Sequence, residues 1–296
     1  MLSVKNKKKL IIGCAQFGSK YGITNTSKPN LKEQRKILNL AKKNKISFID
    51  TSPAYGNSEE NLGKIGVNNF NIISKINKLS KAQLTNKHLQ KDILNNIKTS
   101  LKKLKIKKFY GLLLHNSLDL NCKRGDEIYS AMLEAKKLKL TKKIGISFYD
   151  ILSIEKILFK YNVDIIQVPF NVIDTRILNK KILKHLKKKK VEIHVRSIFL
   201  QGLLMIKNSN MNKYFKRWEG IFLNWEKYLK KVKIDAKSVC VNHALSVKEF
   251  RNIVIGVNSY DQLNEILKIK KNIINKPKNI TSNSKLLIYP YLWKKK

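Results

Sequence analysis

The sequence predicts a (β/α)8 TIM barrel, an α/β fold, built as a single domain over residues 1–296. Short apolar segments rich in Ile, Val and Phe alternate with longer amphipathic segments, a pattern typical of parallel strands covered by helices. About eight such units fit in the chain, and a barrel of this kind typically needs about 250 residues. The glycine-rich fingerprint Gly-x-Gly-x-x-Gly of the alternative, an open doubly wound sheet, does not follow an early strand.

The expected elements alternate along most of the chain. We expect strands at residues 10–14, 45–50, 70–75, 109–115, 143–147, 164–168, 191–196 and 252–256. Apolar residues at helical spacing predict helices at residues 32–44, 89–104, 126–138, 151–161, 175–189 and 260–269. The core of the barrel then covers approximately residues 10–270, and residues 271–296 form a tail. Its apolar end either packs across the barrel or hangs loosely.

The chain is strongly basic, with 62 Lys and Arg against 20 Asp and Glu and a net charge of +42. A nucleic-acid or anionic membrane partner would explain such a charge, but it predicts a clustered basic stripe. The lysines are instead scattered along the whole chain, and Lys, Ile and Asn share A/T-rich codons. We therefore attribute the charge to base composition, and expect no specific nucleic acid and no membrane as partners. The charge still favours anionic cofactors and substrates.

The cysteine pattern indicates a reducing compartment. Cys14, Cys122 and Cys240 are far apart and odd in number, which fits neither a disulfide framework nor a metal site. The apolar run before Gly13 is shorter than the roughly 7–15 residues of a signal peptide core. No segment approaches the roughly 20 apolar residues of a membrane span. These observations predict a cytoplasmic protein without a bound metal, and we expect a monomer or a weak dimer.

Polar residues stand at the ends of the expected strands. In a barrel all carboxyl ends of the strands lie at one face, and that face holds the active site. Each residue alone has an ordinary structural explanation, but packing does not explain such a ring of polar groups. The loop tyrosine Tyr55 follows the first of them and belongs to the same face. The strand-end residues are Asp50, Lys75, His115, Ser147, Gln167, Arg196 and Gly256.

Several segments resemble the aldo-keto reductase family over roughly residues 10–270. They are "FIDTSPAYGNSEENLGK", "IISK", "LLLHN", "IGISFYD", "IIQVPFN" and "IVIGVNSYDQLNEI", and the opening "GCAQFGSKYGITN" is similar to a bacterial branch. The resemblance implies an enzyme that moves a hydride from NADPH or NADH to the carbonyl carbon of an aldehyde or ketone. It also implies a catalytic tetrad of Asp50, Tyr55, Lys75 and His115.

The chemistry of these four residue types fits the implied roles. Tyr55 protonates the carbonyl oxygen as a general acid, although the pKa of a free tyrosine lies near 10. A cation beside Tyr55 would lower its pKa, and Lys75 is the expected cation, kept charged by Asp50. His115 is expected to hydrogen-bond the substrate oxygen and orient it.

The resemblance also implies the residues that hold the cofactor. Ser147 and Gln167 match positions that hold the nicotinamide carboxamide, and the late segment matches the phosphate and adenosine site. Three residues depart from the family pattern: Phe148 stands where Asn is common, Arg196 where a tyrosine often stacks on the nicotinamide, and Asn258 where an Arg or Lys grips the NADP phosphate. The family slightly favours NADPH, and Asn258 leaves NADH open. The full expected set is Ser147, Gln167, Arg196, Ser197, Gly256, Asn258, Gln262 and Glu265.

Two functions from different classes follow. The first is a working carbonyl reductase, whose substrate could be a sugar-type carbonyl and whose specificity loop is expected at residues 199–215. The second is a nicotinamide-binding regulator or sensor on the same barrel, without significant turnover. The intact tetrad favours the reductase, whereas Phe148 and Arg196 keep the sensor open.

Overall fold

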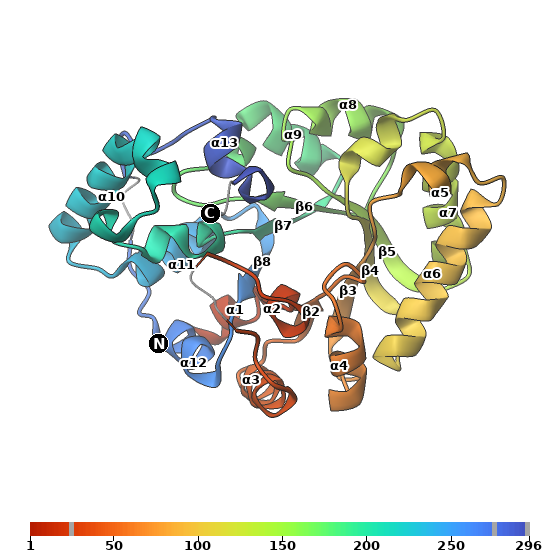
Figure 1. Cartoon of the computed structure of the whole chain (residues 1–296), viewed down its shortest axis with the longest axis horizontal. Coiled ribbons are helices and arrows are strands. Elements are labelled where there is room, and N and C mark those ends of the chain that lie inside the picture. Colours follow the sequence, from red (N-terminus) through yellow and green to blue (C-terminus); the bar gives the residue numbers. More distant parts are fainter. Residues whose placement is uncertain (24–26, 274–276, 294–296) are drawn as a thin grey trace.

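A computed structural model describes residues 1–23, 27–273 and 277–293 of the chain. Eight parallel strands pair in sequence order, and β1 also pairs with β8, which closes the barrel. Helices surround the strands in Figure 1, so the predicted (β/α)8 class is confirmed. The strands are β1 (Leu10–Gly13), β2 (Phe48–Asp50), β3 (Asn71–Ile76), β4 (Phe109–Leu114), β5 (Thr141–Ser147), β6 (Ile165–Pro169), β7 (Glu192–Arg196) and β8 (Phe250–Gly256).

Most of the outer helices cover segments that the periodicity predicts. They are α3 (Leu31–Lys43), α6 (Leu89–Leu104), α7 (Gly125–Lys137), α8 (Ser153–Lys160), α9 (Lys180–Lys188) and α12 (Tyr260–Lys268). The remaining α-helices are α1 (Val4–Lys7), α2 (Ala15–Gly18), α4 (Ser58–Ile65), α5 (Lys81–Thr85), α10 (Glu219–Val232), α11 (Ala236–Ser246) and α13 (Lys285–Ile288), and none of these was predicted.

Two predicted elements begin three or more residues later than expected, and local backbone chemistry explains both. The helix expected at 175–189 begins at Lys180, because the Asn179 side chain caps it by accepting from the Lys181 and Ile182 amides. The strand expected at 45–50 begins at Phe48, because Lys45 has a left-handed φ of 64°. Neither difference moves the carboxyl end of a strand, where the polar residues lie.

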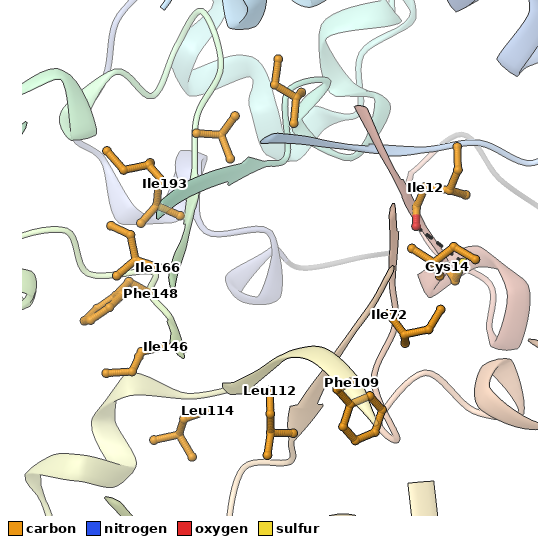
Figure 2. Packing of buried hydrophobic residues seen from close by; sticks show 14 of the residues in the cluster. Ile12, Cys14, Ile72, Phe109, Leu112, Leu114, Ile146, Phe148, Ile166 and Ile193 are labelled. Carbon is orange, nitrogen blue, oxygen red and sulfur yellow. Dashed lines mark hydrogen bonds between the residues drawn. The ribbon is translucent and has the colours of Figure 1, made fainter. Parts of the chain in front are cut away.

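The alternation of side chains along each strand separates two apolar layers. Ile11, Ile73, Leu113 and Ile165 fill the inside of the barrel as one small cluster. Their neighbours along the strands face outward and pack against the helices, as the part of this outer layer drawn in Figure 2 illustrates. Because direction alternates, the residue two positions beyond each inner apolar residue also faces the barrel interior. This rule places Lys75, His115 and Gln167 inside the barrel, one layer closer to the carboxyl ends of the strands than the inner apolar cluster.

A second apolar core lies to one side of the barrel, where α10, α11 and α13 group in Figure 1. The apolar end of the tail is part of it, since Leu287, Tyr289 and Trp293 are buried there. The tail therefore packs against the body rather than hanging loosely, although 274–276 and 294–296 of the expected tail lie outside the described residues. Within the described ranges, no helix combines the length and apolarity needed to cross a membrane.

Candidate active site

Strand register gathers the expected site residues at the carboxyl end of the barrel. Asp50 of β2 is level with Gly13 of β1, which is level with Gly256 of β8. On the opposite wall, Ser147 of β5 is level with Gln167 of β6. Residues spread over more than two hundred positions of sequence thus surround one mouth, as the sequence predicts for the ends of the strands.

A buried ion pair forms the floor of this mouth. The Lys75 Nζ lies 2.7 Å from the Asp50 Oδ1, and the two side chains are only 1% and 5% exposed. Lys75 also donates to the Thr51 carbonyl at 2.9 Å, and the Gln167 amide donates to the Asp50 Oδ2 at 2.7 Å. Each carboxylate oxygen therefore has a donor, which is the condition under which a buried charge pair is tolerated. Gln167 thus acts as a hydrogen-bond donor to the Asp50 carboxylate, a role that the sequence did not predict.

The loop that carries Tyr55 is fixed by backbone contacts. The Tyr55 amide donates to the Ser52 carbonyl at 3.0 Å, and the Tyr55 carbonyl accepts from the Ser58 amide at 3.1 Å, at the start of α4. Helix α2 packs so closely on this loop that a Cβ on Gly18 would lie 1.5 Å from the Tyr55 carbonyl oxygen. Gly56, with a left-handed φ of 55°, faces Gly18. The two glycines therefore allow the opening segment to hold Tyr55 in place.

Tyr55 stands among the other tetrad members as a neutral phenol. The Lys75 Nζ lies 5.0 Å from the centre of the Tyr55 ring, and the His115 ring meets it edge-on with centroids 5.8 Å apart. Burial and the Asp50 carboxylate raise the pKa of Tyr55, and Arg196 only partly opposes them. Burial is the largest cause, so in the resting site the pKa of Tyr55 is raised rather than lowered. The Lys75 ammonium is bound to Asp50 and to the Thr51 carbonyl.

His115 follows β4 and is also neutral. Burial lowers its pKa to about 3, with smaller contributions from the charges of Lys75 and Arg196. Its Nδ1 lies 3.3 Å from the Ser52 hydroxyl, so one ring nitrogen already has a partner on the Tyr55 loop. A neutral imidazole carries one N–H donor, which suits the orientation of a substrate oxygen near Tyr55.

A cavity of about 430 Å³ extends from Tyr55 to the start of α12. Seven of the expected site residues line it: Asp50, Tyr55, Arg196, Ser197, Gly256, Asn258 and Gln262. Lys75, Ser147 and Gln167 are buried and do not line it, and neither does the partly exposed His115. Glu265 does not line it either, because its carboxylate forms an ion pair with Lys237, which does.

The far end of this cavity has the features of a cradle for a nucleotide cofactor. Asn258 Oδ1 and Gln201 Oε1 are buried acceptors without a hydrogen-bond partner among the described residues. The loop after β7 has left-handed backbone at Ser197, with φ of 60°, and at Gln201, with φ of 54°. The residues present therefore fit a nicotinamide dinucleotide, with the orphaned acceptors available to its hydroxyl or amide groups.

Sequence reasoning missed several residues of this site. Gln16 lies against Gly256, where a Cβ would approach its amide nitrogen to 2.2 Å, and Gly18 supports the Tyr55 loop. Both belong to the opening segment that resembles the bacterial branch, but that resemblance alone assigned them no role. The sequence also did not predict the contact of Tyr149 with Arg196, because no local pattern indicates it.

The comparisons with known proteins agree with this fold. The model of the aldo/keto reductase family matches residues 9–279. An aldo-keto reductase from Bacillus halodurans, solved in its holo form, is 17% identical with a TM-score of 0.70, covering 92% of this chain and 89% of its own. A protein from Pseudomonas aeruginosa, provisionally classed as an aldo-keto reductase, is 18% identical with a TM-score of 0.63, covering 89% of each chain. No curated protein sequence matches the chain.

A closed barrel of eight parallel strands covered by helices, with polar residues gathered at the carboxyl ends of the strands, defines a protein of the TIM-barrel class. The family match extends over nearly the whole chain and includes every residue of the mouth. The chain belongs to the aldo/keto reductase family.

Proposed function

We propose that the protein is an NAD(P)H-dependent reductase that converts an aldehyde or ketone to an alcohol, with Tyr55 as the general acid. One observation carries this proposal: a neutral Tyr55 lines a cavity directly above the buried Lys75–Asp50 pair, with His115 at its side. A tyrosine whose pKa is raised keeps its proton in the resting site and delivers it only when an oxygen gains negative charge.

The four residues divide the work. The cofactor, when bound, supplies the hydride for the carbonyl carbon. Tyr55 donates its proton to the carbonyl oxygen, and the Lys75 ammonium above its ring stabilises the phenolate that remains. Asp50 keeps Lys75 charged and fixed, and the neutral His115 donates a hydrogen bond that orients the substrate oxygen. A sugar-type carbonyl compound is the substrate class that we propose.

The same cavity indicates how the cofactor is held. Ser147 and Gln167 would hold the nicotinamide carboxamide, and Ser197, Gly256, Asn258 and Gln262 the phosphates and adenosine, with Glu265 nearby. The Asn258 amide already donates to the Gln262 side chain at 2.8 Å, so this turn is ordered before α12 begins. Asn258 offers no charge to a 2′-phosphate. We therefore expect NADPH and NADH both to bind, with a preference below about tenfold, the size of one exposed ion pair.

The free cysteines support a reducing compartment, and we place the enzyme in the cytoplasm on that ground.

A titration with NADPH and NADH, followed by tryptophan fluorescence, tests cofactor binding. Reduced-nicotinamide absorbance with a panel of aldehydes and ketones then tests turnover. Tyr55→Phe should bind cofactor normally and lose about 10²–10⁴-fold in kcat. Tyr110→Phe, at the other end of the barrel, is the matched control and should keep wild-type kcat.

A nicotinamide-binding sensor is the second candidate, favoured by the departures at Phe148 and Arg196. It differs from the reductase in one measurable respect: both cofactors bind, and no carbonyl compound is reduced. That result would replace the reductase by the sensor, whereas absence of cofactor binding would remove both.

A further inference from the structure

Arg196 presents a positive charge to the active-site cavity without an acidic partner. It ends β7 and lines the cavity together with Tyr55. Its two hydrogen bonds go to neutral acceptors, the Phe148 carbonyl at 3.2 Å and the Ser197 hydroxyl at 3.3 Å. Among the described residues no carboxylate lies within ion-pair distance of it. A guanidinium has five N–H donors, so three remain for a ligand.

A comparison with Arg176 shows that this is not the ordinary state of a partly buried arginine here. Arg176 is held by both oxygens of Asp174, with each N–O distance 2.8 Å. The charge of Arg176 is therefore neutralised within the protein, whereas the charge of Arg196 is available to whatever enters the cavity.

The position of Arg196 is nevertheless fixed. The carbon at the centre of its guanidinium lies 4.0 Å from the centre of the Tyr149 ring, a stacking distance. Tyr149 in turn packs against Tyr291 and Tyr289 of the tail, with centroids 4.9 and 5.6 Å apart. This support holds the cation in place before a ligand arrives, which lowers the entropy that binding would otherwise cost.

Arg196 is also close to the reacting groups. Its charge acts on both Tyr55 and His115, opposing the rise in the pKa of the first and adding to the fall in the pKa of the second. Tyr149 covers one face of the guanidinium, so a ligand in the cavity would meet its remaining N–H donors.

We propose that Arg196 binds an anionic group of the substrate, a carboxylate or a phosphate, a few bonds from the carbonyl carbon. The inference rests on the proposed reductase function and adds a substrate class to it. The tyrosines of the tail act on selectivity indirectly, as positioning residues for Arg196.

Matched pairs of carbonyl compounds test this directly. The carboxylate pair is 4-oxobutanoate and butanal, and the phosphate pair is glyceraldehyde 3-phosphate and glyceraldehyde. We expect the wild-type enzyme to have a higher kcat/KM for the charged member of at least one pair. In Arg196→Gln the ratio of kcat/KM for the charged member to kcat/KM for the neutral member should fall about 10–100-fold, the usual effect of losing a charged hydrogen bond, whatever the loss that both members share. The pair with the larger loss identifies the anion.

Two further variants distinguish a direct contact between Arg196 and the substrate from a general attraction of anions by the positive charge of the whole protein. Arg35→Gln removes the same charge from an exposed position on α3 and should leave the charged-to-neutral ratio unchanged. Arg196→Lys keeps the charge and should retain part of the ratio. Thermal unfolding of each variant shows that it is folded, and fluorescence titration gives its cofactor Kd.

Each outcome has a distinct meaning. An equal loss on charged and neutral members, or a weakened cofactor Kd with an unchanged ratio, would overturn the inference and assign Arg196 to general structure or to the cofactor. A wild-type enzyme that reduces neutral aldehydes without any preference for the charged ones would overturn the inference and leave the reductase standing. Failure to reduce any of the four compounds, or any other carbonyl, would overturn both.

Discussion

The two ends of the barrel carry the same three groups in opposite arrangements. At the carboxyl end, Lys75 lies 2.7 Å from Asp50 and 5.0 Å from the centre of the Tyr55 ring. At the amino end, Lys143 lies 2.7 Å from Glu192 and 4.9 Å from the centre of the Tyr110 ring. A lysine, a carboxylate and a tyrosine thus meet twice inside one fold.

The difference lies in the tyrosine hydroxyl. The Tyr110 hydroxyl donates to Glu192 at 3.1 Å and accepts from Lys143 at 2.9 Å, so it is used both as a donor and as an acceptor. The Tyr55 hydroxyl makes no hydrogen bond to a residue in the described ranges, and it faces a cavity. The two ion pairs also differ in exposure. The side chains of Lys143 and Glu192 are 23% and 19% exposed, whereas those of Lys75 and Asp50 are 1% and 5% exposed. The same groups therefore close one end of the barrel and leave a proton donor available at the other.

Breaking the ion pair should cost far more at the mouth than at the amino end. Lys75→Met leaves the Asp50 carboxylate buried without a cation, which destabilises a protein by about 3–5 kcal/mol. Lys143→Met leaves a carboxylate that water reaches, so we expect about 1–2 kcal/mol. Urea unfolding measures both, and turnover should disappear only in Lys75→Met. Equal losses of stability would remove the distinction between the two ends.

As the pH falls, the free energy of unfolding should first decrease through protonation of His115 at the carboxyl end of the barrel. His115 has a pKa of about 3 in the folded protein and an ordinary value of 6.5 when unfolded. Between these values the unfolded chain binds the extra proton, so stability falls as the pH drops from 6.5 toward 3. We expect about 2–3 kcal/mol after allowance for solvent screening. His115→Gln should flatten this part of the curve of unfolding free energy against pH; an unchanged slope would count against a buried neutral histidine.

The amino end should respond at lower pH. Burial opposes ionisation of Glu192, but His194 and Lys143 outweigh it and hold the pKa at about 2, against 4.5 when unfolded. Stability from this carboxylate is complete above pH 4.5 and is lost as the pH falls toward 2. Because the group is partly exposed, we expect about 1–2 kcal/mol. The difference between wild type and Glu192→Gln, measured at pH 5 and pH 3, checks this window.

The smallest effect concerns the tyrosines themselves. Tyr110→Phe removes two hydrogen bonds at a partly buried site and should cost about 0.5–1.5 kcal/mol without changing kcat. Tyr55→Phe removes a hydroxyl that has no bond to a described residue, so its stability should match that of the wild type. Thermal unfolding of the pair, set beside their kcat values, would contradict the comparison if Tyr55→Phe were the less stable of the two.

The sequence predicted those parts of this picture that depend on periodicity. Alternation along each strand and the common face of strand ends place Asp50, Lys75 and Gln167 together, and the barrel itself is confirmed. The bond from Gln167 to Asp50 joins residues 117 positions apart, and no local pattern encodes such a contact. The close approach of Gly18 to the Tyr55 loop is hidden for the same reason. The roles of the tetrad and of the cofactor residues remain predictions until the experiments above are made.

The pairing of β1 with β8 has a consequence for the order of folding. The cavity is lined by Gly13 and Gln16 from the beginning of the barrel and by Gly256 and Asn258 from its end. These segments meet only after nearly the whole chain has left the ribosome and the last strand has docked, a contact of very long sequence separation. A molecule that contacts both sets of residues would bridge this junction and would bind the closed barrel more tightly than an opened one. Its presence should therefore delay opening between the first and last strands, and hydrogen exchange at those two strands would report it.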